Sequence, residues 1–431
     1  MNPVRVSILT FGCRANQYES DVMRTVLSPR YALVSEGADV VLVNGCTVTR
    51  LAERKARQAV RRSRRANPGA VVVLVGCIAQ AVRERLTRFD EADLIAGNAW
   101  KSRIDDVVTE ALAGTRGRLP EAAPIGLDTE RSAGPSGRIR AFLRVQDGCN
   151  QACAYCRPTQ VRGPSRSKSI RAAVEEAVEL VDAGFPEIVL TGINLAQYAP
   201  PDGQLRDLLK EILGTAGPRR LRLASINPAG LTDDLLDTFR DDRRLCRHFH
   251  VPLQSGADEV LGEMRRGYTT STYRERIERI VASLPDATFG TDLIVGFPGE
   301  TEAAFQATCN LVTQVGFSNL HVFRFSPRPG TAAAELPNPV PEAIKRQRAD
   351  RLVEIWKPVR AGLLDSRIAT TQDVLVEECI DGKWQGYTAD YIFVSFSSDR
   401  VLNIGEERCV RILGTHEDRL EGEDRDRDHT G

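Results

Sequence analysis

The sequence predicts an α/β protein of three successive domains, and three patterns in its 431 residues support that prediction. Residues 1–112 carry three continuous runs of Val, Leu and Ile separated by helical segments, which predicts an N-terminal parallel α/β domain. From residue 138 to residue 366 strands and helices alternate six times, which predicts a partial (β/α)6 barrel. Residues 367–415 hold short alternating runs, which predict a small antiparallel β-barrel.

The three apolar runs of the N-terminal domain all end in Gly-Cys. They are VSILTFGC, ADVVLVNGC and AVVVLVGC, and they end at Cys13, Cys46 and Cys77. Functional groups gather at the carboxyl ends of parallel strands, so we expect these cysteines to meet although they lie far apart in the sequence. One such cysteine would be explained as a small buried hydrophobe. Three at equivalent positions favour a cofactor site.

The central domain follows residues 113–137, which are rich in Gly, Pro and small polar residues and are expected to form a linker. Its strands are predicted in RIRAFLRVQ, EIVLTGIN, LRLASIN, HFHVPLQSG, TFGTDLIVGFPGE and NLHVFRFSPRPGT. Barrel enzymes place their chemistry at the C-terminal ends of the strands. The residues expected at or just beyond those ends are Cys149, Thr191, Ser225, Gln254, Gly296 and Ser326.

The C-terminal domain is predicted from DVLVEECI, WQGYTADYIFVSFS and RCVRILG, which alternate apolar and polar residues. The final stretch, residues 416–431, reads HEDRLEGEDRDRDHTG and is strongly charged. Such a composition buries too little apolar surface to fold alone, so we expect a disordered tail.

Composition excludes several classes of protein. The chain has 58 basic and 58 acidic side chains, so it is not a uniformly basic nucleic-acid binder. No apolar run approaches the roughly 20 residues of a membrane span, and the start lacks a signal peptide, which together predict a cytoplasmic protein. Ten cysteines in that compartment indicate reduced thiols or metal ligands rather than disulfides.

The stretch DGCNQACAYC places Cys149, Cys153 and Cys156 in a C-x3-C-x2-C spacing. Three thiolates can hold three irons of a 4Fe–4S cluster and leave one iron open to a small molecule. Zinc with a distant fourth ligand is the alternative, but zinc sites usually pair two C-x-x-C motifs and this chain has no second one.

This motif, after a strand that opens a β/α barrel, resembles the cluster motif of radical S-adenosylmethionine enzymes. The resemblance implies that the three cysteines hold a 4Fe–4S cluster whose fourth iron binds the amine and carboxylate of S-adenosylmethionine. It implies further that one electron from an external donor releases methionine and a 5′-deoxyadenosyl radical. The side chains and turns expected beside this cofactor are Tyr155, Thr191, Gly192, Asn194, Ser225, Gln254, Gly296 and Phe323.

The order of three Gly-Cys strand ends, a radical motif and a small C-terminal barrel resembles the methylthiotransferases over essentially the whole chain. The resemblance implies that Cys13, Cys46 and Cys77 hold a second 4Fe–4S cluster and that the C-terminal barrel is an RNA-binding TRAM domain. The implied reaction replaces C–H by C–S–CH3, with sulfur from the second cluster and methyl from a second S-adenosylmethionine.

The stretches FGCRANQYES and NGCTVTRLAERKARQAVRRSRRANPG resemble the branch that modifies C2 of N6-threonylcarbamoyladenosine, at position 37 of tRNA beside the anticodon. Arginines clustered on one predicted helix suit a phosphate backbone, although a solvated helix face would look the same. The residues expected to contact RNA or substrate are Arg57, Arg61, Arg162, Arg265, Arg266, Tyr387 and Tyr391.

Three alternatives remain at this point. Within the family, the substrate could be isopentenyladenosine in tRNA or an aspartate of a ribosomal protein. From another class, the chain could be a non-catalytic iron–sulfur protein that binds RNA.

His248 and His250, in the strand HFHVPLQ, are expected to pack within the barrel rather than bind a metal.

Overall fold

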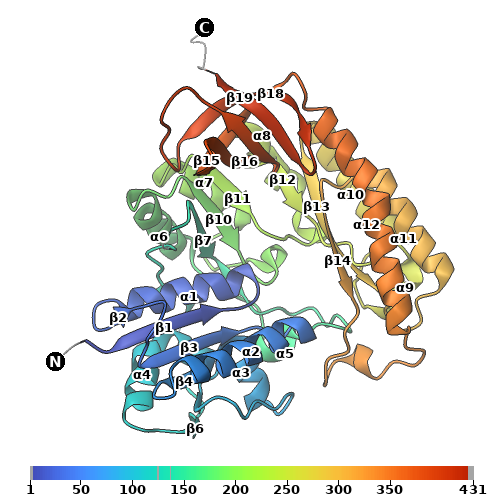
Figure 1. Cartoon of the computed structure of the whole chain (residues 1–431). Helices are drawn as coiled ribbons and strands as arrows, with labels where there is room; N and C mark the ends of the chain where they lie inside the picture. Colours follow the sequence, from blue (N-terminus) through green and yellow to red (C-terminus); the bar gives the residue numbers. More distant parts are fainter. Residues whose placement is uncertain (1–2, 124–125, 136, 426–431) are drawn as a thin grey trace.

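The computed structural model describes residues 3–123, 126–135 and 137–425 of the chain. Its three domains follow one another along the sequence (Figure 1). The N-terminal domain, drawn in blue, packs below the central barrel, drawn in green to orange. The small C-terminal barrel, drawn in red, covers the opposite end.

The N-terminal domain is a six-stranded sheet in the order β2-β1-β3-β4-β5-β6, and every neighbouring pair is parallel. Its strands are β1 (Arg5–Thr10), β2 (Ala32–Leu33), β3 (Val40–Gly45), β4 (Val71–Val75), β5 (Leu94–Ile95) and β6 (Gly117–Arg118). Its helices are α1 (Arg14–Leu27), α2 (Arg50–Ala66), α3 (Gly76–Arg83), the 3-10 helix η1 (Asn98–Arg103) and α4 (Ile104–Leu112). The short strand β6 lies in the predicted linker, so the domain is longer than its apolar runs indicated.

The central domain is a parallel barrel that is open on one side. Two three-stranded sheets, β11-β10-β7 and β12-β13-β14, are joined by an isolated bridge between Ser225 and His250. No pairing between β7 and β14 occurs in the described part of the chain, so the barrel opens between them. The strands are β7 (Arg140–Arg144), β10 (Glu187–Thr191), β11 (Arg220–Leu223), β12 (His248–His250), β13 (Thr288–Val295) and β14 (Asn319–Arg324).

Helices cover the outside of this barrel, and they bury a continuous apolar core against the strands. They are α6 (Ile170–Asp182), α7 (Leu205–Thr215), α8 (Asp233–Asp241), α9 (Asp258–Glu263), α10 (Thr270–Ser283), α11 (Glu302–Val315) and α12 (Glu342–Asp365). A short strand β8 (Gln146–Asp147) follows β7 and pairs with β9 (Arg166–Ser167), and helix α5 (Pro158–Arg162) lies between them. The β8–α5 segment carries the C-x3-C-x2-C motif.

The C-terminal barrel is closed in the order β15-β16-β17-β19-β18. Its strands are β15 (Thr371–Ile380), β16 (Lys383–Thr388), β17 (Phe393–Ser397), β18 (Glu407–His416) and β19 (Arg419–Arg425).

The expectation of a disordered tail after the C-terminal barrel was wrong for residues 419–425. The segment expected to begin a disordered tail forms β19, and β19 pairs in parallel with β17. Leu420 is fully buried, and Gly422 lies so close to β18 that an added Cβ would be 2.5 Å from the Arg411 carbonyl oxygen. One inward leucine and one close-packed glycine give this charged segment enough contact to complete the barrel. Residues 426–431 of the expected tail lie outside the described residues.

None of the helices described here is both long enough and apolar enough to span a bilayer.

Candidate functional site

The three N-terminal cysteines come together at one edge of the sheet. Cys13 is the N-cap of α1, Cys46 follows β3, and Cys77 is in the first turn of α3. The Sγ atoms of Cys13 and Cys77 lie 3.9 and 3.8 Å from the same atom, Asn16 Oδ1. A Cβ placed on Gly12 would lie 3.1 Å from Cys46 Sγ, so glycine is needed there for the third thiol to approach.

The central cysteines lie on the loop between β8 and α5. The backbone N–H of Cys156 donates to the Cys153 carbonyl, and the N–H of Cys149 donates to the Gly163 carbonyl. Gly148, immediately before Cys149, has φ +73°, and a Cβ there would be 1.9 Å from the Pro164 carbonyl oxygen. This loop is therefore folded tightly around its thiols.

The described thiols are spaced more widely than a single zinc ion would hold them. A tetrahedral zinc with Zn–S bonds of about 2.3 Å holds its sulfurs about 3.8 Å apart. Within the described ranges, the set of three metal-ligand atoms that all lie within 4.8 Å of one another is His250, Asp292 and His321, so neither cysteine triad is that compact. Three thiols with no close fourth ligand suit a cubane that keeps one iron open.

Polar groups beside the sulfurs also suit a cluster. Arg266 Nη1 lies 3.4 Å from Cys153 Sγ, Asn194 Nδ2 lies 3.7 Å from Cys149 Sγ, and the Val48 N–H donates to Cys46 Sγ at 3.4 Å. Donors of this kind stabilise the negative charge of a cluster.

Burial favours the protonated thiol at Cys46 and Cys156. Burial, reinforced by the neighbouring thiols, raises the pKa of Cys46 to about 12. Burial likewise raises the pKa of Cys156 to about 12. Iron binding therefore has to displace a proton at each of these sulfurs.

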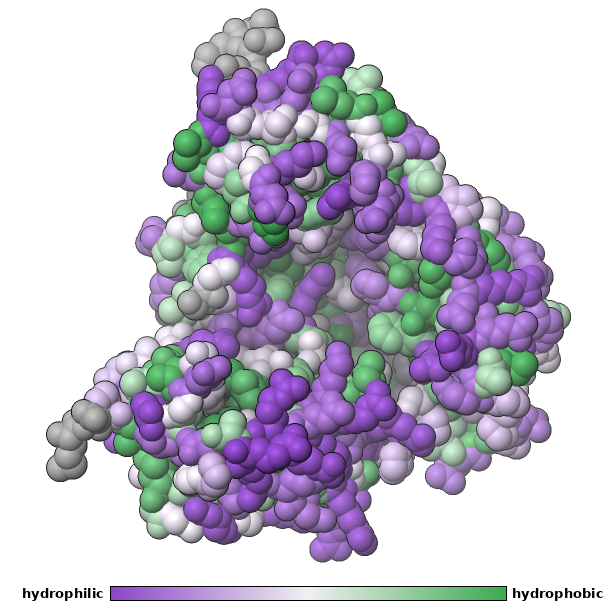
Figure 2. Space-filling model, viewed as in Figure 1, coloured by the Kyte–Doolittle hydropathy of each residue, from purple (hydrophilic) through white to green (hydrophobic). Residues whose placement is uncertain are grey.

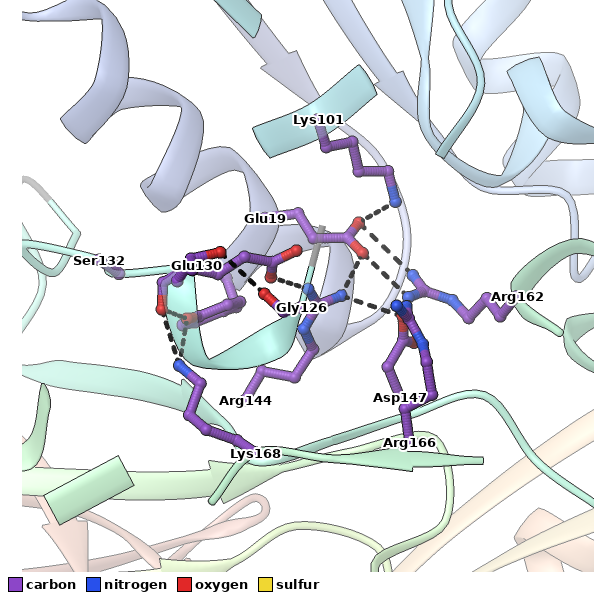
Figure 3. Close-up of polar contacts among 12 residues, drawn as sticks. Glu19, Lys101, Gly126, Glu130, Ser132, Arg144, Asp147, Arg162, Arg166 and Lys168 are labelled. Atoms are coloured by element: carbon purple, nitrogen blue, oxygen red, sulfur yellow. Dashed lines mark hydrogen bonds and ion pairs between the residues drawn. The ribbon is translucent and has the colours of Figure 1, made fainter. Parts of the chain in front are cut away.

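A buried ion network, drawn in Figure 3, lies between the N-terminal domain and the segment that carries the central cysteines. Arg162, from α5 of the barrel, donates to Glu19 Oε1 at 2.9 Å, Asp147 Oδ1 at 2.8 Å and Asn16 Oδ1 at 2.8 Å. Glu19 also receives Arg144 Nη1 at 2.6 Å and lies 2.6 Å from Lys101 Nζ. These contacts hold the N-terminal domain against the loop between β8 and α5 that carries the central cysteines.

The network fixes the charge of its carboxylates. Burial alone would raise the pKa of Glu19, but the charges of Arg162, Lys101 and Arg144 outweigh it and lower that pKa to about 2. A second cluster of ions extends the same interface: Lys168 pairs with Glu176, which accepts the Tyr18 hydroxyl at 3.0 Å. Both groups of ion pairs lie between domains, where removal of one partner leaves a buried uncompensated charge.

Several of the residues expected beside the cofactor lie near the loop that carries the central cysteines. Thr191 is buried at the end of β10, and Gly192 would place a Cβ 2.8 Å from Gln146 Oε1. The Asn194 N–H donates to that same Gln146 oxygen at 2.8 Å. Tyr155 is partly buried and packs against the hydrophobic cluster that contains Ala154 and Phe297.

Others lie further around the barrel lumen. Ser225 is half-buried after β11, and Gln254 adopts φ +73° where it bridges to β13. Gly296 has φ +71°, and its N–H donates to Glu300 Oε2 at 2.6 Å. Phe323 shares a strand face with His321 and is 43% exposed, so its ring remains free to contact a ligand.

The residues expected to contact RNA are placed unevenly. Arg57 and Arg61 form ion pairs with Glu91, so part of the charge on α2 is neutralised. The Arg265 side chain is exposed, and its backbone has the left-handed conformation, with φ +57°.

Two of these arginines are almost fully buried. Arg162 is 8% exposed and held in the interdomain network described above. Arg266 is also 8% exposed and contacts Cys153 and Tyr268. Both were expected to contact RNA or substrate; in this structure they instead contact the surroundings of the cysteines, and a contact with the substrate stays a prediction.

Tyr387 and Tyr391 face the central barrel. Both line a cavity of about 760 Å³ at the open side of that barrel, which appears as the central hollow in Figure 2. The Arg222 guanidinium lies 3.6 Å from the Tyr391 ring centroid, and His248 meets the same ring edge-on at 5.5 Å. His248 is 4% exposed, in agreement with the packing role expected from the sequence.

The lumen contains one cluster that the sequence analysis did not assemble. Asp292 Oδ1 lies 3.1 Å from His250 Nε2 and 3.0 Å from His321 Nδ1. The three residues come from neighbouring strands β12, β13 and β14, and Asp292 is paired in register with His321. Burial opposes ionisation of Asp292, but hydrogen bonds from the two histidines prevail and lower its pKa.

Family profiles match two parts of the chain. One described as the radical SAM superfamily matches residues 143–312, and one described as uncharacterized protein family UPF0004 matches residues 5–97.

Curated relatives match nearly the whole chain. Threonylcarbamoyladenosine tRNA methylthiotransferase MtaB of Thermotoga maritima is 37% identical over 96% of this chain and 95% of its own length. The protein of that name from Bacillus subtilis is 32% identical over 95% and 93%. The tRNA-2-methylthio-N(6)-dimethylallyladenosine synthase of Desulfotalea psychrophila is 33% identical over 88% and 89%.

Solved structures share the fold at low sequence identity. The radical S-adenosylmethionine methyltransferase TsrM of Kitasatospora setae has a TM-score of 0.60 at 15% identity, covering 77% of this chain and 75% of that one. The cobalamin-dependent S-adenosylmethionine radical enzyme OxsB has a TM-score of 0.52 at 10% identity, covering 83% and 56%.

The barrel, its cysteine loop and these matches define a radical S-adenosylmethionine enzyme. Within that class, the chain belongs to the methylthiotransferase family, and it is a transferase. The cofactors of the family are S-adenosylmethionine and two 4Fe–4S clusters. The donor sets of the two cysteine triads fit them.

Sequence reasoning missed the groups that surround the cysteines. Asn16, Glu19 and Lys101 carry no motif, and their role depends on the docking of two domains. One signal was present: Asn16 follows Cys13 by three residues, which places both on one face of a helix that begins at residue 14.

Proposed function

We propose that this chain adds a methylthio group at C2 of N6-threonylcarbamoyladenosine in tRNA, at position 37 beside the anticodon. The observation that carries the proposal is the presence of two cysteine triads in a chain that matches threonylcarbamoyladenosine methylthiotransferases over 95–96% of its length. The partners are then a tRNA and an external electron donor, and the place of action is the cytoplasm, where tRNA is modified.

The six cysteines would hold the two clusters, three on each side of the network around Arg162. When bound, the cofactors supply an adenosyl radical that removes the C2 hydrogen atom, and the sulfur and methyl group that replace it. The chain itself positions these groups. Glu19, Asp147 and Arg162 hold the two cysteine sites in one rigid arrangement, since each lies within a buried and paired network.

Two unpaired polar atoms support a place for S-adenosylmethionine. The buried Asn194 Oδ1 accepts no hydrogen bond within the described residues, although Asn194 Nδ2 lies beside Cys149. The Ser326 hydroxyl, after β14, is likewise buried and without a partner there. A buried acceptor beside an open cluster suits the ammonium of an amino acid, because an unpaired buried polar group is costly.

The test is a reaction with defined tRNA under anaerobic conditions. Purified protein with reconstituted clusters is incubated with dithionite, S-adenosylmethionine, sulfide and tRNA that carries threonylcarbamoyladenosine. Mass spectrometry of the digested nucleosides should show the 2-methylthio product together with 5′-deoxyadenosine. Modification of tRNA that carries isopentenyladenosine instead would support the branch represented by the Desulfotalea psychrophila relative.

Two further outcomes separate the remaining alternatives. A methylthio group found only on a ribosomal-protein aspartate would show that the substrate is a protein. tRNA binding without 5′-deoxyadenosine would identify a non-catalytic iron–sulfur protein.

A further inference from the structure

The cavity at the open side of the barrel is built from all three domains. Arg14 and Gln17 line it from the N-terminal domain, Arg138 and Phe142 from the barrel, and Tyr387 and Tyr391 from the C-terminal barrel. Its volume of about 760 Å³ is enough for a nucleoside with a polar substituent. Arg14, which lines the cavity, directly follows Cys13 in the sequence.

The charges around the cavity are unevenly compensated. Arg140 is paired with Glu187 and with Glu377, so its charge and that of Glu377 are taken up. Glu378 is an exposed carboxylate on β15 of the C-terminal barrel.

Arg14 and Arg138 form no ion pair with any residue that the structure describes. Arg138 Nη1 donates to Gln17 Oε1 at 2.9 Å, and Asp21, whose charge also acts on Arg138, forms its ion pair with Arg24 instead. The Arg14 guanidinium lies 5.8 Å from the Tyr391 ring centroid. Two guanidinium groups thus enter the same cavity with spare donors, beside aromatic rings that suit a flat base.

The carboxylate of the threonylcarbamoyl substituent would lie on the same edge of the adenine as the reacting carbon C2. Its second amide N–H can bond N1 of adenine and close a six-membered ring, which folds the threonyl group along the N1 edge. C2 adjoins N1, so the carboxylate and the reacting carbon lie on the same edge of the base. A base whose C2 faces the Cys13 site would therefore direct its carboxylate towards the residues next to Cys13.

We propose that Arg14 and Arg138 bind the carboxylate of the threonylcarbamoyl group and thereby select this nucleoside. The inference rests on the proposed function and names the subsite that distinguishes its substrate. Guanidinium groups pair with carboxylates through two parallel hydrogen bonds, whereas an uncharged isopentenyl group offers them nothing.

The experiment measures binding with matched ligands. Two chemically synthesised anticodon stem-loops carry either threonylcarbamoyladenosine or its neutral primary amide at position 37. Their affinities for the cluster-loaded full-length protein are compared by fluorescence anisotropy at one fixed salt concentration. The wild-type chain should bind the carboxylate form about tenfold or more tighter than the amide form.

The variants Arg14→Gln and Arg138→Gln should each reduce this preference to threefold or less, without changing affinity for the amide form by more than twofold. Arg138→Lys should retain part of the preference, because it keeps the charge but loses the planar fork. Arg346→Gln, on the outer face of α12 where the side chain is 78% exposed, is the matched control and should leave the preference unchanged.

An unchanged preference in both glutamine variants, or no preference in the wild-type chain, would overturn the inference. Failure of the proposed function is distinguishable, because it would appear as absence of the 2-methylthio product in wild-type reactions. If the wild-type chain forms the product but the preference for the carboxylate form is unchanged in both glutamine variants, only the carboxylate subsite is refuted and the proposed function stands.

Discussion

The Arg162 guanidinium donates to Asn16 Oδ1 at 2.8 Å, and this contact links the two cysteine sites. The Asn16 oxygen lies within 3.9 Å of the Sγ atoms of Cys13 and Cys77. Arg162 also binds Asp147, which precedes Cys149 by two residues. A single buried cation therefore touches the immediate surroundings of both triads and fixes how they face each other.

Arg162→Gln should strongly destabilise the docking of the two domains. It leaves Glu19 and Asp147 buried with less compensating charge, which costs about 3–5 kcal/mol when a buried pair is broken. Arg166→Gln is the matched control, because Arg166 pairs with the same Asp147 but is 37% exposed, and it should cost less than about 1 kcal/mol. Urea denaturation of both variants measures the difference. Equal small losses would mean that the Arg162 network does not hold the interface.

Acid should weaken the same interface through Glu19. Its pKa is lowered from its usual 4.5 to about 2 in the folded chain, so its contribution is fully present above about pH 4.5 and is lost as the pH falls towards 2. The contribution is on the order of 3 kcal/mol. Denaturation midpoints between pH 5 and pH 3 should therefore fall more steeply for the wild-type chain than for Glu19→Gln. Parallel curves would contradict this assignment.

Gly148→Ala should disturb the central cysteine loop more than Gly163→Ala. Both glycines have a positive φ, of +73° and +76°, and Gly163 has ψ −161°, so backbone strain of about 1–3 kcal/mol is expected for an alanine at either position. Only at Gly148 would the new Cβ collide with backbone, 1.9 Å from the Pro164 carbonyl oxygen. We expect Gly148→Ala to lose the iron bound by Cys149, Cys153 and Cys156, while Gly163→Ala keeps it. Iron analysis of the two variants decides this, and equal retention would contradict the prediction.

The strands and the six cysteines were predictable because their signals are local. Continuous apolar runs indicate buried parallel strands. A Gly-Cys at the end of each run places the cysteine thiol at the edge of the sheet where the strands end. The grouping of Cys13, Cys46 and Cys77 followed from that rule alone, and the structure brings them together.

What the sequence did not reveal depends on contacts between domains. Arg162 looked like one more basic residue, but its neighbours Asn16 and Glu19 belong to another domain. Strand β19 looked like a charged tail, since Leu420 is its one apolar residue and the partners of its charges, such as Arg408 for Asp424, lie elsewhere in the sequence. Charge patterns describe surfaces well, and they mislead where a charge is buried against a partner distant in the sequence.

The most direct test of the account is an anaerobic count of iron and sulfide in the wild-type chain and in two triple variants. One replaces Cys13, Cys46 and Cys77 by alanine, and the other replaces Cys149, Cys153 and Cys156. Two cubanes predict about eight irons per wild-type chain and about four in each variant. Undiminished iron in either triple variant, or one zinc and no iron in the wild-type chain, would contradict the central claim that each triad holds its own cluster.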